Sequence, residues 1–102
     1  MANTFKNYVN TGIGTSASTS YTVASSTTAV MIGMTVANVT ASQITVDVRC
    51  AGAYLVKGAA IPSGGALSVL DGKIILETAD TVVVTSDTAS SADVIISVLE
   101  QT

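Results

Sequence analysis

The chain has 102 residues, the length of one domain, and its four basic and seven acidic residues leave a formal net charge of −3. Charged residues make up 11% of the sequence, far below the roughly 25% of ordinary soluble domains, and histidine is absent. Because the basic residues are scattered and the apolar runs are short, we expect no nucleic-acid binding and no membrane-spanning segment.

The low charge also predicts the character of the surface. Hydrophobic residues account for 48% of the sequence, so exposed positions must be filled largely by serine, threonine, alanine and glycine. Charge depletion is typical of the cores of protein interfaces, where little charge then has to be desolvated. We therefore expect a component of an assembly. The alternative is a monomer whose surface simply carries few charges.

The N-terminal stretch differs from the rest of the chain. MANTFKNYVN holds two aromatic residues, Phe5 and Tyr8, and the residues after it are small. We interpret residues 1–17 as an extended N-terminal arm and residues 18–102 as a single domain. Phe5 and Tyr8 either pack on a neighbouring subunit or begin the first strand. The stretch lacks the apolar core of a secretory signal, so we expect synthesis in the cytoplasm.

Alternation of apolar and polar residues with a period of two dominates the remainder. In QITVDVRC, residues 43–50, one face is apolar and the other polar, which indicates a half-buried strand. In residues 28–38 both faces are nearly apolar, which indicates a central or doubly covered strand, and Gly33 within it indicates a bulge. The other predicted strands are 18–24, 53–57, 66–70, 73–77, 81–86 and 92–100. A helix over 92–100 is the alternative there, although the apolar residues form no helical stripe.

The stretch IPSGGALSVLDGKIILETAD, residues 61–80, holds the only proline and the only adjacent glycine pair. A phosphate-binding loop needs a helix after its glycines and a lysine at a fixed offset, and the strand-like ALSVL follows instead. We interpret Pro62–Gly65 as a turn and Asp71-Gly72 as a two-residue hairpin turn. Turn signals at intervals near ten residues predict an all-β fold, a small antiparallel β-sandwich or jelly-roll-like domain.

Groups that could perform chemistry are few. Without histidine, neither a Cys-His nor a Ser-His pair can form within the chain, and we expect no enzyme. We predict no cofactor, and Asp80, Asp87 and Asp93 lack the spacing of a calcium loop. Cys50 is predicted as a small buried apolar residue, with a nucleophile or an intermolecular bridge as alternatives. The candidate subunit-contact residues are the aromatic ones: Phe5, Tyr8, Tyr21 and Tyr54.

Three segments carry a resemblance to a known group of proteins. They are TVANVTASQITVDV, AYLVKGAAIPSGGALSVLDGKIILETADTVVVTS and ADVIISVLE, with Asn38, Pro62, Gly64, Asp80 and Glu100 as the fixed residues among them. Over residues 13–100 the chain resembles small virion structural proteins of tailed bacteriophages, particularly those that infect cyanobacteria and other marine bacteria. A departure lies at Thr78-Ala79-Asp80, where that family often has glycine before the aspartate.

The resemblance implies a structural protein located in the virion. Its expected role is capsid decoration or cementing, with the major capsid protein or neighbouring virion proteins as partners. It also implies a homo-oligomer, for which a trimer would fit the symmetry of a capsid. A neck, tail or baseplate component is the alternative within the same class. A module that binds host-surface glycans is the alternative outside it, with Tyr21 and Tyr54 as its aromatic candidates.

Overall fold

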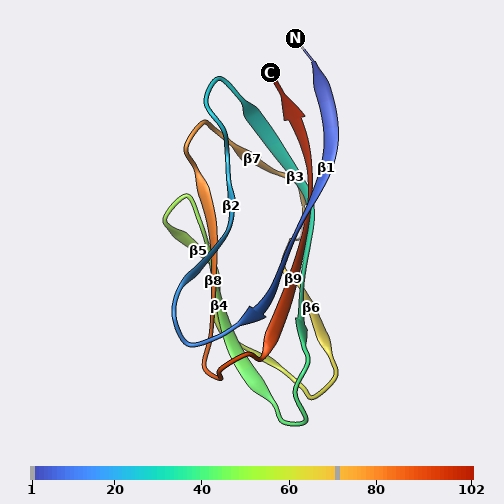
Figure 1. The fold of residues 1–102 in the computed structure, drawn as a ribbon, viewed down its shortest axis with the longest axis vertical. Helices are drawn as coiled ribbons and strands as arrows, with labels where there is room; N and C mark the ends of the chain where they lie inside the picture. Colours follow the sequence, from blue (N-terminus) through green and yellow to red (C-terminus); the bar gives the residue numbers. More distant parts are fainter. Residues whose placement is uncertain (1, 71) are drawn as a thin grey trace.

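The computed structural model describes residues 2–70 and 72–102 and places them in strands, turns and loops, with no helix among the described residues (Figure 1). Accordingly, no described segment is a helix long and apolar enough to cross a membrane. The strands are β1 (Asn3–Ile13), β2 (Ser18–Thr22), β3 (Thr28–Asn38), β4 (Ile44–Cys50), β5 (Ala53–Ile61), β6 (Ala66–Ser68), β7 (Ile74–Leu76), β8 (Thr81–Ser86) and β9 (Ala92–Gln101).

These strands form two antiparallel sheets stacked on each other, as the right and left sides of Figure 1 show. Sheet A has the order β1-β9-β3, and both β6 and β7 pair with the far side of β3. Sheet B has the order β2-β8-β4-β5. The predicted all-β antiparallel sandwich is confirmed, and residues 92–101 form a strand rather than the alternative helix.

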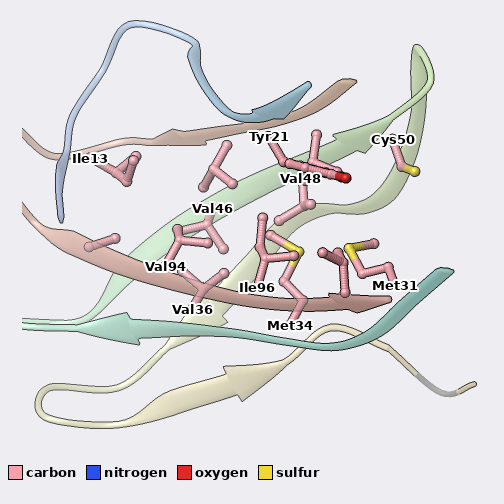
Figure 2. Packing of buried hydrophobic residues seen from close by; sticks show 14 of the residues in the cluster. Ile13, Tyr21, Met31, Met34, Val36, Val46, Val48, Cys50, Val94 and Ile96 are labelled. Carbon is pink, nitrogen blue, oxygen red and sulfur yellow. The ribbon is translucent and has the colours of Figure 1, made fainter. Parts of the chain in front are cut away.

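The core lies between the sheets and follows from the alternation in the sequence. In β4 the side chains of Ile44, Val46 and Val48 are buried, while the residues between them are not. The same pattern in β9 buries Val94 and Ile96, and Figure 2 shows these side chains meeting those of sheet B. Each such aliphatic side chain contributes roughly 1.5–3 kcal/mol on burial, so the period-two pattern drives the stacking.

The predicted extended arm is replaced by a strand. Strand β1 pairs with β9 from Asn3↔Gln101 to Ile13↔Ala92, and it forms one edge of sheet A. The pairing continues to the ends of the chain, where the N–H of Ala2 donates to the carbonyl of Thr102 at 3.1 Å. The physical reason is that β9 without β1 would leave a row of backbone donors and acceptors unpaired.

The predicted hairpin turn at Asp71-Gly72 includes Asp71, which lies outside the described residues, but the strands on either side of it are described. Strands β6 and β7 do not pair with each other but lie end to end along β3. Strand β3 has 11 residues, which is long enough to pair with both. The N–H of Val69 still donates to the carbonyl of Met34 at 3.0 Å, and the pairing with β3 resumes in a shifted register at Ile74.

Two other local predictions are confirmed. The register between β3 and β9 shifts between Met31 and Gly33, so the bulge lies where glycine indicated it. The N–H of Gly65 donates to the carbonyl of Pro62 at 2.9 Å, closing a turn in which Gly64 has φ of 68°. This positive φ at the third position defines a type II-like turn, so the glycine pair is structural.

Candidate functional site

Two of the candidate contact residues, Tyr8 and Tyr21, join the two sheets. Tyr8 projects from β1 and Tyr21 from β2, and their ring centroids lie 4.6 Å apart. Both hydroxyls donate to the same carboxylate oxygen, Oε2 of Glu100, at 2.8 and 2.6 Å. Tyr21 is only 4% exposed, so its side chain belongs to the core and is not offered to another subunit. Tyr8 is half-buried.

The electrostatics of this bridge keep its protons on the phenols. Burial, together with the adjacent Glu100 carboxylate, raises the pKa of Tyr21 above its ordinary range, and the same causes raise the pKa of Tyr8. The hydrogen bond from Tyr21 lowers the pKa of Glu100, and the bond from Tyr8 and the charge of Lys6 act in the same direction. The arrangement is a charge-assisted structural link between sheets, not a group poised for proton transfer.

Tyr54 lies elsewhere, on the outer face of sheet B. Its side chain is 49% exposed, with Arg49 Cζ 5.3 Å and Lys57 Nζ 4.7 Å from the ring centroid. Asp47 of the same sheet accepts a hydrogen bond from the N–H of Gly58 at 2.6 Å. The Tyr54 ring is therefore accessible but already engaged by two cations.

The three aspartates that were considered for a calcium loop are engaged in backbone hydrogen bonds, and Asp93 lies in β9 and not in a loop. Asp80, Asp87 and Asp93 each accept a backbone N–H, at 2.9, 3.1 and 3.1 Å respectively. The N–H of Thr45 is the main cause that lowers the pKa of Asp87. Within residues 2–70 and 72–102, no three metal-ligating side chains gather.

Cys50 is a free, buried cysteine at the end of β4. Burial raises the pKa of its thiol, and the charge of Asp80 adds to the effect. A thiol with a raised pKa is a poor nucleophile at neutral pH, because the thiolate is the reactive form. The geometry thus agrees with the interpretation of Cys50 as a small apolar residue.

The most unusual surface is the outer face of sheet A, which faces away from the core. Its large exposed apolar side chains come from four different strands: Phe5, Val9, Ile32, Ile75 and Ile95. Phe5 is the most exposed of them, at 74%. The five strands of this sheet carry only three charged residues, Lys6, Asp93 and Glu100, and Glu100 points toward the tyrosines.

The strand register arranges this face in rows that run across the strands. Phe5, Leu99, Val30 and Ile75 are successive partners in one row, which we call the apolar ridge. The neighbouring row consists of Asn7, Ser97 and Gly33, whose side chains are short or absent, and we call it the low row.

A shallow hollow follows this low row. Ile32 is the extra residue of the β3 bulge beside it and is 42% exposed. A Cβ atom built on Gly33 would meet nothing within 4 Å, which shows that the space above the strand is open. The residues that line the hollow are Phe5, Lys6, Asn7, Ile32, Ser97 and Val98.

Of the residues on this face, sequence reasoning identified only Phe5. The available signal was that residues 28–38 are nearly apolar on both of their alternating faces, and that Ile95 and Leu99 lie on the more polar face of residues 92–100. That pattern was interpreted for β3 as a central or doubly covered strand. Strand β3 is indeed central in sheet A, but its second face is open.

Comparison with known proteins adds no relative: no family model matches the chain, and no curated protein matches it. Support for a function therefore comes from the fold, the surfaces and the pattern of residues. Together they define an antiparallel β-sandwich with one uncovered apolar sheet face.

Proposed function

We propose that this chain is a non-enzymatic structural protein of a bacteriophage virion, which decorates or cements the capsid through contacts between subunits. Its partners are the major capsid protein or neighbouring virion proteins, together with further copies of the chain. It is made in the host cytoplasm and ends in the particle.

The observation that carries the proposal is the outer face of sheet A. Contiguous exposed apolar surface that is larger than the small patches of ordinary monomers marks a site of interaction. Here large exposed side chains from four strands gather on one sheet face, and few charges lie among them. Weak contacts of this kind become strong when many copies are held on one lattice, because the effective concentration is high.

Two further features support the same function. The groups most suited to chemistry have structural roles, since Glu100 joins the sheets and Cys50 is buried. The residue pattern shared with small phage virion proteins includes Asn38, whose buried amide donates to the carbonyls of Ser42 and Ile61 at 2.7 and 3.0 Å. Asn38 therefore has a folding role, as the resemblance implies for a fixed turn residue.

The test is the copy number of the chain in purified, washed particles of the virus or prophage that encodes it. Quantitative mass spectrometry against the major capsid protein is expected to give on the order of hundreds of copies, as a shell lattice requires. A single ring of copies would instead assign the chain to the neck, tail or baseplate. Recovery of the chain only in the soluble fraction would overturn the virion assignment.

A further inference from the structure

We propose that the outer face of sheet A is a homodimer interface, in which two copies of the chain stack face to face about a two-fold axis. The same face carries the proposed function, and the pairing deepens that proposal because it names a second copy of the chain as the occupant of the face. In such an isologous contact each copy uses the same surface, so that surface must be complementary to itself in size, shape and charge.

The size of the face suits a stable dimer. The face is four strand positions wide at about 4.8 Å each, and β9 is ten residues long at about 3.4 Å each. An axis between the Leu99 and Ser97 rows overlaps four of the five rows of the face, so the flat overlap is on the order of 500 Å², and the relief of the side chains adds to it. Specific interfaces bury roughly 600–1,000 Å² of accessible surface on each partner, so a second copy of the same face falls in the lower part of this range.

The shape is also self-complementary. The apolar ridge and the low row lie two residues apart along the strands, which is about 7 Å. A two-fold axis parallel to these rows, halfway between them, places the ridge of each copy in the hollow of the other. Because this axis keeps each strand over the same strand of the partner, Phe5 of one copy lies over Asn7 of the other, and Val30 lies over the open space at Gly33.

The charges permit this stacking. Along β9, Asp93 lies three rows beyond the Leu99 row of the ridge. An axis near the ridge therefore keeps the two Asp93 carboxylates far apart. Sheet B offers no comparable face, because Asp47, Arg49 and Lys57 lie on its strands. In the dimer, sheet B of each copy remains outward and available for other partners.

Sedimentation equilibrium of the full chain over about 1–100 μM tests the pairing, since specific dimers commonly dissociate in or below this range. The wild type is expected to be a dimer. Phe5→Thr removes the most exposed side chain of the apolar ridge and is expected to raise the dissociation constant about thirtyfold, as for a hot-spot residue. Tyr54→Thr is the matched control, because it removes an exposed aromatic side chain from an edge strand of the other sheet.

A second variant separates loss of the contact from loss of the fold. Gly33→Thr fills the hollow, and its added Cβ has free space in the single chain. We expect an unchanged circular dichroism spectrum, because threonine suits a strand better than glycine does. We expect a dissociation constant raised at least tenfold, because the threonine side chain occupies the space that the partner's ridge would enter.

Several results would overturn the proposal. A wild type that is monomeric throughout the range, or that forms a trimer or larger species, would do so. Equal weakening by Tyr54→Thr, or full dimerisation of Gly33→Thr, would also rule out this face. The two tests can fail separately. If the chain forms the dimer in solution but is absent from particles, the virion role is wrong and the pairing stands. If the chain is found in particles but is monomeric in solution, the pairing is wrong and the virion role stands.

Discussion

At the scale of single residues, Glu100 has the most consequential contacts in the molecule. It lies on β9 in sheet A, yet one of its two tyrosine donors, Tyr21, belongs to sheet B. The other donor, Tyr8, comes from the edge strand β1. One carboxylate oxygen therefore links three strands and both layers at the same end of the sandwich.

Removing the Tyr21 hydroxyl is expected to cost more than removing that of Tyr8. Tyr21→Phe deletes a buried 2.6 Å bond to a charged acceptor and should lower the free energy of unfolding by roughly 1.5–3 kcal/mol. Tyr8→Phe leaves a site that water can reach, so a loss of about 1 kcal/mol or less is expected. Urea unfolding of both variants measures the difference, and equal losses would contradict the assigned geometry.

Acid is expected to weaken the same link. The folded chain holds the pKa of Glu100 below its usual value, chiefly through Tyr21, so its ionised form stabilises the fold. That contribution is complete above the unfolded pKa of about 4.3 and is lost as the pH falls through the folded pKa. Thermal unfolding between about pH 6 and pH 3 should show a decline that is shallower in Glu100→Gln. An identical decline in the variant would assign the acid sensitivity to other carboxylates.

The residue scale also shows where sequence reasoning reached its limit. The alternation correctly placed Cys50 on the buried face of its strand. It could not separate Tyr21 from Tyr54, because both lie in predicted strands and both are tyrosines. Tyr21 is buried because Tyr8 and Glu100, far away in sequence, meet it. Tyr54 faces solvent on sheet B, where Arg49 and Lys57 lie close to its ring.

At the scale of elements, the two adjacent glycines serve different needs. Gly64 adopts a φ of 68°, a region that most residues occupy only with strain. At Gly65 an added Cβ would lie 2.9 Å from Cγ of Pro62, which is too close for any side chain. The pair therefore fixes the reversal between β5 and β6 through one conformational and one steric requirement.

The Gly64 requirement predicts a graded response to substitution. Gly64→Ala should cost roughly 1–2 kcal/mol, because the alanine Cβ disfavours the left-handed region. Gly64→Asn should cost less, because asparagine tolerates that region better. Thermal melting measures both, and a loss of about 1 kcal/mol corresponds to a fall of roughly 4–8 °C for a domain of this size. Equal melting temperatures for the two variants would contradict the turn geometry.

Other element-level features needed the tertiary structure. The segment Asp71-Gly72 has the local sequence of a hairpin turn, but β6 and β7 both pair with β3. Both strands pair with β3 because β3 has 11 residues, and its edge on the side away from β9 is long enough for both. Local turn chemistry does not determine which strand the flanking segments pair with, because that depends on the partner edges that the fold leaves open.

At the scale of the whole molecule, the two ends of the chain lie side by side (Figure 1). Strand β9 occupies the centre of sheet A between β1 and β3, so this sheet needs both the first and the last strand. Such long-range pairing raises the contact order, and we expect folding to be slow for a domain of this length.

Deletion of residues 2–12 is expected to destabilise the entire fold. The deletion removes β1, uncovers the edge of β9 and leaves Glu100 without its Tyr8 donor. Loss of cooperative melting and aggregation on size-exclusion chromatography are the expected signs, because an exposed strand edge recruits other chains. Phe5→Thr, which keeps β1, is the control. A truncated chain that melts as the wild type would show that residues 2–12 are a dispensable arm.

The sequence alone determined that this chain is an all-β protein, where most of its strands lie and which positions of β4 face the core. It did so because side-chain direction in a strand alternates with a period of two, and this property is local. Only the tertiary structure decided that residues 3–13 complete a sheet, that β6 and β7 share one partner and that one apolar face stays open. These features depend on pairing between distant segments, which local periodicity does not encode.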